Sequence, residues 1–182
     1  IPTPNHYIKF GASAISHEFR PGAASYKSSV SEVNIDSTFG SPPVGAWEFS
    51  AYIEDDVKLS PKLKTNVGVH ASGFQVKDEF FYSLQPRLAL RYLITPSLSA
   101  KASYAEMQQF IHLLTNSGIG LPTDLWVPAT DRIKPQQSRQ AAIGLAKSFS
   151  RMYEVSVEGY YKKMKNLIEY KEGASYLNVT EN

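Results

Sequence analysis

Cysteine is absent from the 182-residue sequence, which excludes disulfide scaffolds, thiol nucleophiles and cysteine-ligated zinc sites. The sequence also lacks a large excess of charge of one sign. It has 19 Lys and Arg and 17 Asp and Glu, which give a formal net charge of +2. This balance excludes the electrostatic footprint of a nucleic-acid-binding protein and a polybasic membrane patch. No uninterrupted apolar stretch approaches the ~20 residues of a membrane-spanning helix, so a helical membrane protein is excluded as well.

The sequence also lacks an initiator methionine and a recognisable signal peptide at its start, so we expect a fragment or a processed chain. What it does contain is a large share of aromatic residues, 12%, with 11 tyrosines among them. Aromatic residues of this kind suit strands, sugar-binding surfaces and membrane interfaces. The hydrophobic fraction of 42% argues against a chain that is disordered throughout.

Apolar and polar residues alternate along residues 47–59 with a period of two. The odd positions carry Trp47, Phe49, Ala51, Ile53, Val57 and Leu59, and the even positions carry Glu48, Ser50, Tyr52, Glu54, Asp56 and Lys58. Only Asp55 breaks the alternation. A period of two places apolar side chains on one face of a β-strand and polar ones on the other. The same pattern predicts seven strands in all, over residues 6–15, 47–59, 63–72, 84–94, 98–104, 139–149 and 153–163.

The connections between these strands are of two kinds. Those at residues 60–62, 95–97 and 150–152 are tight, whereas the other three are longer. The sequence therefore predicts an all-β, antiparallel up-and-down meander with tight turns at one end and long loops at the other. The two longest loops, residues 20–46 and 106–138, are rich in Ser, Gly and Pro.

Two local features modify this expectation. Met107, Phe110, Ile111 and Leu114 have helical spacing, so a short helix is a possible interruption of the second long loop. Pro86 falls within a predicted strand although proline donates no hydrogen bond to a ladder. We therefore expect a β-bulge at Pro86 or a position early in its strand.

Three features suggest that the apolar strand face meets lipid rather than a protein core. Residues 47–59 are long enough to cross a bilayer at a tilt near 45°. Tight turns at one end and long loops at the other are typical of transmembrane barrels. Aromatic residues occur near both strand ends, where two interfacial girdles are expected, although all of them could instead be packing aromatics. They are Phe149, Tyr153 and Tyr92 near the tight turns, and Trp47, Phe74 and Tyr161 near the loops.

Three consecutive segments carry a family resemblance. They are LQPRLALRYLITPSLSAKASYAEMQQFIHLL, IKPQQSRQAAIGLAKSF and YEVSVEGYYKKMKNLIEY. In order and spacing they resemble the later barrel strands of TonB-dependent outer-membrane receptors, over most of residues 47–170. The resemblance implies an active importer whose barrel of about twenty-two strands surrounds an N-terminal plug. It also implies a bacterial outer-membrane location and a TonB-type energy-coupling protein as partner, through a region upstream of Ile1.

Neither the plug nor the coupling box is found in residues 1–182, which we interpret as a single segment of a transmembrane β-barrel. The polar inward residues Arg87, Arg91, Lys101, Glu154 and Glu158 are expected to line the lumen. The two long loops are expected to meet the ligand outside, with Trp126 as a candidate ligand contact. The imported ligand itself stays open, since siderophore, glycan, cobalamin and peptide importers differ in these loops.

No catalytic, cofactor or metal site emerges from the sequence. The four histidines are scattered and form no HExxH or other spaced ligand set. Glu54 and Asp56 share a strand face but are expected to be solvated lumen charges rather than an acid–base pair. Lys162, Lys163 and Lys165 form a basic run at a strand end, which could meet lipopolysaccharide phosphates or simply be solvated.

Two alternatives from other classes stay open at this point. One is a small soluble β-barrel or sandwich that binds a ligand or carbohydrate. The other is a complete eight-stranded outer-membrane barrel, for which one more strand near the C-terminus would suffice. An enzyme is the weakest of the readings, because no nucleophile–base set can be assembled from the spacing.

Overall fold

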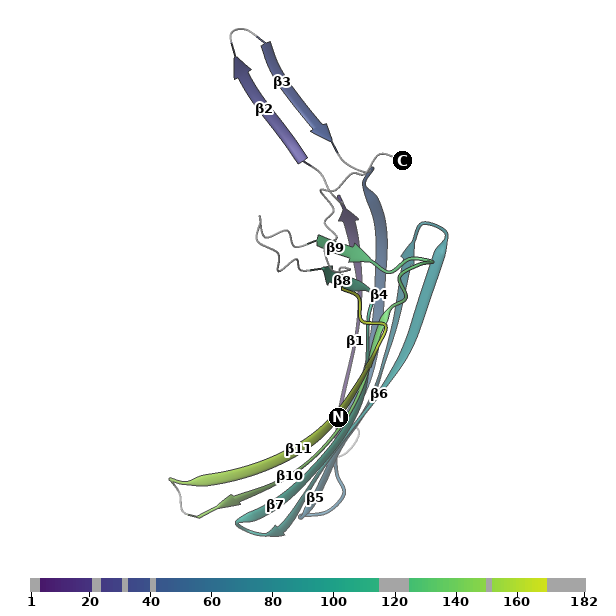
Figure 1. The fold of residues 1–182 in the computed structure, drawn as a ribbon. Helices are drawn as coiled ribbons and strands as arrows, with labels where there is room; N and C mark the ends of the chain where they lie inside the picture. Colours follow the sequence, from purple (N-terminus) through teal and green to yellow (C-terminus); the bar gives the residue numbers. More distant parts are fainter. Residues whose placement is uncertain are drawn as a thin grey trace.

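The computed structural model describes residues 4–20, 24–30, 33–39, 42–114, 125–149 and 152–169, and every regular element in them is a β-strand (Figure 1). Seven long strands form the main sheet: β1 (His6–Phe19), β4 (Val44–Lys58), β5 (Leu63–Val76), β6 (Glu79–Thr95), β7 (Leu98–Gln109), β10 (Gln136–Ser148) and β11 (Glu154–Lys165). Two hairpins pair β2 (Ala24–Val30) with β3 (Val33–Phe39), and β8 (Ile111–Leu114) with β9 (Leu125–Pro128). Within these ranges no helix is long and apolar enough to cross a membrane.

The main sheet is an antiparallel meander whose strand order, β1-β4-β5-β6-β7-β10-β11, follows the chain once the two hairpins are set aside. This order confirms the predicted all-β antiparallel meander. The seven predicted strands are those of the main sheet, and the two hairpins add four strands that were not predicted. The sheet is long and strongly curved (Figure 1), and β1 and β11 form its two edges, so it is open. An open, curved meander with this topology is consistent with a section of a larger barrel.

The strands are longer than the sequence pattern indicated, mainly at the loop end. The predicted long link between residues 72 and 84 is wrong, because β5 and β6 continue through it and are joined by only Lys77 and Asp78. Lys77 adopts a positive φ of 50°, the left-handed conformation that a two-residue hairpin turn requires. Tight and long connections therefore do not alternate strictly along the chain.

Both predicted long loops contain strands. Residues 24–39 form the β2–β3 hairpin inside the predicted loop 20–46. In the second loop, β7 runs on to Gln109 and the β8–β9 hairpin follows. The expected short helix is wrong, because Met107 lies in β7 and residues 111–114 form β8. Strand pairing with a distant partner, Ile111 opposite Pro128, has overridden the helical spacing of a few apolar residues.

Pro86 lies in the middle of β6, and the expected bulge is not found there. Its pairing with Val69 of β5 is continuous with the rest of that ladder, and the only irregularity between β6 and β7 falls between Leu93 and Thr95. The β6–β7 ladder starts at Arg87, one residue after the proline. On the side of β6 that faces β7, Pro86 therefore has no ladder partner. Proline is tolerated at such a position because no strand there requires a backbone N–H donor.

The sheet has one apolar and one polar face, as the alternation predicted. Large apolar side chains stand exposed on the outer face of every long strand, among them Phe10, Ile53, Val67, Leu88, Ile143 and Val157. Asp55, the exception to the alternation, is on this outer face and is paired there with His6, whose Nδ1 lies 2.6 Å from Asp55 Oδ2. The charge that breaks the pattern thus has a partner on the neighbouring strand.

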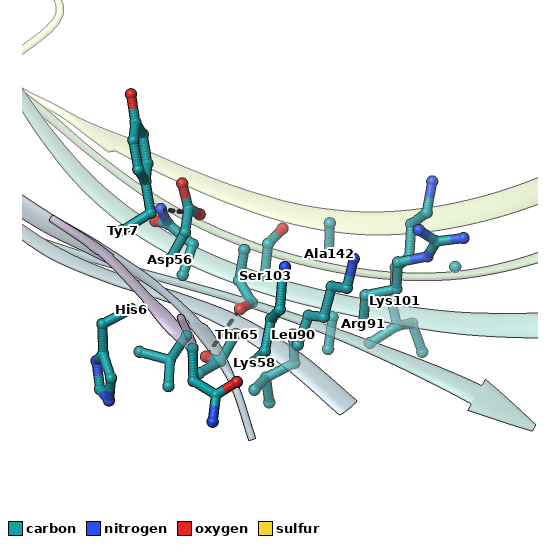
Figure 2. A pocket seen from close by; sticks show the side chains of 18 of the residues that line it. His6, Tyr7, Asp56, Lys58, Thr65, Leu90, Arg91, Lys101, Ser103 and Ala142 are labelled. Atoms are coloured by element: carbon teal, nitrogen blue, oxygen red, sulfur yellow. Dashed lines mark hydrogen bonds between the residues drawn. The ribbon is translucent and has the colours of Figure 1, made fainter. Parts of the chain in front are cut away.

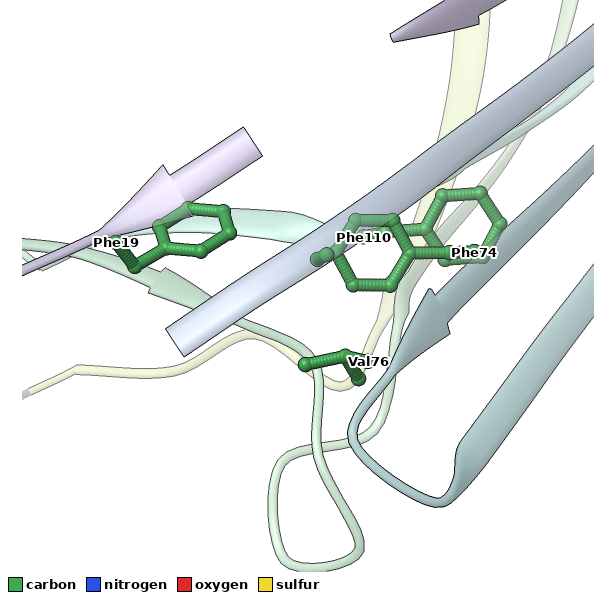
Figure 3. Packing of buried hydrophobic residues seen from close by; sticks show 5 residues of the cluster. Phe19, Phe74, Val76 and Phe110 are labelled. Carbon is green, nitrogen blue, oxygen red and sulfur yellow. The ribbon is translucent and has the colours of Figure 1, made fainter. Parts of the chain in front are cut away.

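The buried core is small and lies at the loop end of the inner face (Figure 3). It comprises Phe19, Ala46, Phe74, Val76 and Phe110, with Val44, Phe81 and Ile111 packed against it. Phe110 is the residue between β7 and β8, so the chain folds back over the inner face at this point. The backbone N–H of Ala129, just after β9, donates to the carbonyl of Phe110 at 2.7 Å and holds this segment in place.

Phe74 corrects one of the six girdle assignments. It is 0% exposed, whereas Phe149, Tyr153, Tyr92, Trp47 and Tyr161 are all exposed. The physical reason is the period of two: Phe74 has the same parity as the inward-facing His70 and Ser72 in β5. Its ring therefore points to the inner face, where Phe110 covers it.

Candidate functional site

The polar inner face of the sheet is the candidate functional surface. Because the pairings are antiparallel and continuous, apart from the irregularity between Leu93 and Thr95, inward-facing residues of successive strands line up in rows across the sheet. Each row crosses the strands roughly at right angles. The rows differ in chemistry from the loop end to the turn end, where the turn end is defined by the connections at residues 59–62, 96–97 and 149–153.

Neutral hydrogen bonds dominate the rows in the middle of the sheet. The hydroxyls of Ser13 and Ser50 lie 2.8 Å apart across β1 and β4. Two strands further on, the side-chain amide of Gln85 donates to the hydroxyl of Ser72 at 2.8 Å, and both residues are buried. The hydrogen bonds in these rows join neutral groups, although Nδ1 of His70, which lies opposite Gln85, is buried without a hydrogen-bond partner in the described part of the chain.

Nearer the turn end, Lys9 of β1 is bound by two carboxylates of β4. Its Nζ lies 2.9 Å from Asp56 Oδ2 and 3.1 Å from Glu54 Oε1. Asp56 also accepts a hydrogen bond from the side-chain amide of Asn66 at 2.8 Å. Glu54 and Asp56 thus share one face, as the sequence indicated, and they neutralise a lysine there.

At the turn end itself, four cations occupy one row. Lys58 of β4 is opposite Lys64 of β5, Lys64 is opposite Arg91 of β6, and Arg91 is opposite Lys101 of β7. We call Lys58, Lys64, Arg91 and Lys101 the basic row. The row continues through Gly144 of β10 to Glu158 of β11.

The basic row lines a cavity of about 780 Å³ on the inner face (Figure 2). In that view Lys58, Arg91 and Lys101 extend to the same side of the sheet as Tyr7 and Asp56. Small residues of the adjacent row, Ala89 and Ala142, also line the cavity and leave space beside the cations. All four members of the basic row are exposed.

The structure brings together some of the five predicted lumen residues and separates others. Arg91 and Lys101 are register partners in the basic row, and Glu158 lies further along it. Arg87 shares the inner face but pairs with Gly68, two rows nearer the loops than the basic row. Glu154 lies at the start of β11, opposite Ser148. Their part in ligand passage stays a prediction.

Sequence reasoning missed Lys58 and Lys64 as members of this surface. The available signal was parity, because Lys58 and Lys64 both occupy polar positions of their alternating strands. Counting from the turns does not give the row. The pairings of Ser60 with Leu63 and of Thr95 with Leu98 are each offset by one residue from the pairings of Lys58 with Lys64 and of Arg91 with Lys101.

Metal ligation finds no support in the described ranges, where no group of three or more His, Cys, Asp or Glu side chains comes together. Histidines instead make local contacts. His17 Nε2 lies 3.0 Å from Glu48 Oε2, and His112 in β8 is buried. Burial lowers the pKa of His112, a shift that the Lys134 backbone partly opposes, so this imidazole is held in its neutral form.

The candidate contacts at the loop end occupy different elements. Trp126 lies in β9 and is 55% exposed. Trp47 lies on the outer face of β4, is 50% exposed, and stacks on Phe49 with ring centroids 6.1 Å apart.

In the basic run of β11, Lys163 and Lys165 have the parity of the outer-facing Tyr161, and Lys162 has the opposite parity. Only two of the three lysines are therefore on the apolar face.

Comparison with known proteins gives one match. The family model described as TonB dependent receptor-like, beta-barrel matches residues 5–182. Neither a search of curated proteins nor a search of solved structures found a match. The matched range includes the eleven strands of the described residues and every residue of the basic row.

Proposed function

The chain belongs to the TonB-dependent receptor-like β-barrel family, whose model covers residues 5–182, and from this membership we propose that it forms part of the barrel wall of an outer-membrane receptor that imports a ligand. The observation that carries the proposal is this match over nearly the whole chain. Import would draw energy from the inner membrane through a TonB-type coupling protein. That partner would engage a region outside residues 1–182.

The distribution of side chains over the two faces supports this proposal. A soluble sandwich buries its apolar strand face in a core, but here the apolar outer face is exposed along the full length of the sheet. Contiguous exposed apolar surface of this extent marks a lipid or protein contact. The inner face carries the hydrogen-bonded and ionic rows, as expected for a water-filled or plugged lumen.

The remaining assignments follow from this placement. Membrane lipid would cover the outer face, and Lys163 and Lys165 would meet lipopolysaccharide phosphates beyond the aromatic residues at the loop end. Trp126, exposed in β9, would contact the ligand from outside. The chain's role in this scheme is transport and not catalysis, and no cofactor enters it.

Location in the membrane can be tested with cysteine labels, since the chain has no cysteine of its own. Val67→Cys places a label on the outer face, and the adjacent Asn66→Cys places one on the inner face at the same depth. In outer-membrane vesicles of the full receptor, lipid-borne nitroxides should quench a fluorophore at position 67 and spare one at position 66. Equal quenching at both positions would remove the proposed orientation.

Import requires a separate test because the ligand is unidentified. Cells with and without the receptor would be grown in a complex medium, and compounds removed from that medium would be identified by mass spectrometry. We expect at least one compound whose removal needs both the receptor and an intact proton gradient, with a protonophore as the control. Identical removal profiles in all conditions would contradict the import function.

A further inference from the structure

Resting on the proposed function, which places the outer face in lipid, we propose that a glycolipid of the outer leaflet binds in a split in the barrel wall between β6 and β7. The headgroup of this lipid is a neutral sugar. We define the split by residues 79–86 of β6 and residues 106–109 of β7, which belong to neighbouring strands but do not pair with each other. It opens on the outer face of the sheet, away from the lumen.

The backbone of β6 is unpaired along the split. The β6–β7 ladder begins at Arg87 and Ala105, so residues 79–86 have no strand partner on that side in the described part of the chain. An open strand edge does not occur within hydrocarbon, because its N–H and C=O groups would have no partner. Lysines, prolines or a bulge usually protect exposed edges, and residues 79–85 contain none of these. A polar molecule beside this edge would satisfy its backbone groups.

The split lies at the level of the lipid headgroups. Tyr92 is near the tight turn of β6, and Tyr82 is ten positions earlier in the same strand and on the same outer face. In a strand that rises ~3.4 Å per residue at a tilt of ~40°, ten residues span about 26 Å along the membrane normal, close to the ~25 Å apolar band of a barrel. With Tyr92 at the turn-end boundary of this band, Tyr82 reaches the loop-end boundary.

Side-chain amides line a cavity in the split. Its volume of about 410 Å³ lies within the ~300–1,000 Å³ of small-molecule sites. Gln108, Gln137 and Asn166 contribute the amides. Nε2 of Gln137 lies 3.5 Å from Oε1 of Gln108, and the other amide groups of these two glutamines have no hydrogen-bond partner in the described ranges. Amides both donate and accept hydrogen bonds, so they match the hydroxyl groups of a sugar.

The charges around the cavity favour a neutral headgroup. Its charged lining residues are Glu79, Asp131 and Lys134, so two acids stand against one base. A phosphate would meet net negative charge there, whereas a neutral sugar would not. The split therefore differs from Lys163 and Lys165, which lie on the same outer face and suit phosphates.

Aromatic and aliphatic side chains provide the surface for the apolar parts of the lipid. Phe80 and Tyr82 line the cavity and are exposed on the outer face, Tyr82 by 79%. Their rings offer a flat apolar surface to one face of a sugar, and the tyrosine hydroxyl adds a polar group. Toward the turn end, the exposed Leu84, Leu88 and Tyr104 continue into the apolar outer face, where acyl chains would lie. The headgroup site is thus continuous with the surface that faces lipid.

The test is hydrogen exchange of the full receptor in phosphatidylcholine vesicles. Exchange of the amides of residues 79–85 would be followed by mass spectrometry in phosphatidylcholine alone, with added digalactosyldiacylglycerol as the neutral glycolipid probe, and with added phosphatidylglycerol as the anionic probe. At ten times its Kd the glycolipid leaves about one tenth of the sites free, so exchange should slow about tenfold. Phosphatidylglycerol should leave it unchanged, and the paired amides of β10 are the internal control.

Two matched variants test the cavity itself. Gln137→Leu removes one amide from the cavity and should raise the Kd of the glycolipid probe at least about tenfold, because the headgroup loses hydrogen bonds there. Gln140→Leu makes the same change in the same strand but on the inner face, and it should leave the Kd unchanged.

Four results would overturn the proposal. The first is exchange of residues 79–85 that the glycolipid does not slow. The second is equal slowing by phosphatidylglycerol, which would mean that any lipid covers the edge. The third is slow exchange in phosphatidylcholine alone, which would mean that a protein segment fills the split. The fourth is an equal effect of Gln137→Leu and Gln140→Leu on the Kd.

Failure of this proposal is distinguishable from failure of the proposed function. The labels at Val67→Cys and Asn66→Cys report which face of the sheet meets lipid, and neither residue lines the split. Quenching confined to position 67, together with any of the four results above, would keep the membrane placement and reject the glycolipid site.

Discussion

The ring of Phe110 stacks on the ring of Phe74 with their centroids 5.2 Å apart and their planes 5° from parallel. Phe74 belongs to the barrel wall in β5, and Phe110 is the residue where the chain leaves β7 for the β8–β9 hairpin. The contact joins residues 36 positions apart in sequence and attaches this hairpin to the inner face. It holds the segment from Phe110 into β8 against the inner face at the loop end of the sheet.

Phe110→Ala should release that hairpin. Truncation of a buried phenylalanine costs about 3–5 kcal/mol, and here the loss falls on the contact that holds β8 and β9 to the wall. Hydrogen exchange of β8 and β9 amides, followed by mass spectrometry, should become faster while exchange in β4 and β5 stays slow. Phe149→Ala is the control, because that ring is 63% exposed on the outer face.

Acidification should loosen the same hairpin through His112, which is 2% exposed in β8. Burial lowers its folded pKa below the ordinary value near 6.5, so the opened state binds a proton that the closed state does not. Stability is therefore full above about pH 6.5 and falls as the pH drops below it. Exchange of β8 and β9 amides at pH 7.5 and pH 5.5, each corrected for intrinsic rates, measures the loss.

His112→Gln is the matched variant for that measurement. It keeps a polar side chain of similar length but removes the titration, so the difference between the two pH values should disappear. His17, which contacts Glu48 at 3.0 Å on the same inner face, is left intact by this change. A pH effect that persists in His112→Gln would show that His112 is not its source.

Val67→Arg should destabilise the barrel in lipid much more than Asn66→Arg. Val67 is on the exposed apolar face, where an arginine near the bilayer midplane costs ~2–4 kcal/mol. Asn66 is on the inner face beside Asp56, so an arginine there gains an acidic neighbour. Urea titration of the full receptor folded into phospholipid vesicles would compare the two free energies of unfolding, and similar losses would reject the assignment of the faces.

The two tryptophans should respond differently to quenchers in the lipid headgroup region. Trp47 stacks on Phe49 on the outer face of β4, where the aromatic girdle of a barrel lies. Trp126 is in β9, outside the main sheet. In a full receptor whose other tryptophans have been replaced, lipid-borne quenchers should dim Trp47 strongly and Trp126 little. Equal quenching would contradict this placement.

The strands and their two faces were predictable because they depend on local alternation. Residues 47–59 gave a strand that the structure confirms as Val44–Lys58, and its outer and inner residues are those the parity indicated. The tight turn at Ser60 was equally clear from the short Ser-Pro-Lys break. Position along such a strand decides the face by covalent geometry alone, with no reference to distant residues.

The errors have two different causes. Phe74 was assigned to a girdle because an aromatic near a strand end is usually interfacial, but its parity in β5 already places it on the inner face, where Phe110 covers it. The helical spacing from Met107 to Leu114 gave way to pairing of β8 with β9, whose residues begin at Leu125. That partner is not adjacent in sequence, so no local pattern contained the pairing.

The sequence by itself determined that this chain is an antiparallel meander with an apolar face and a polar face, because a period of two fixes where each side chain points. Only the tertiary structure decided which polar residues stand beside one another. Lys58, Lys64, Arg91 and Lys101 are scattered over 44 positions of the chain, and they form one row only after three successive registers are set. Register is a property of pairs of strands, and a shift of two residues in any hairpin would keep both faces intact while dispersing the row.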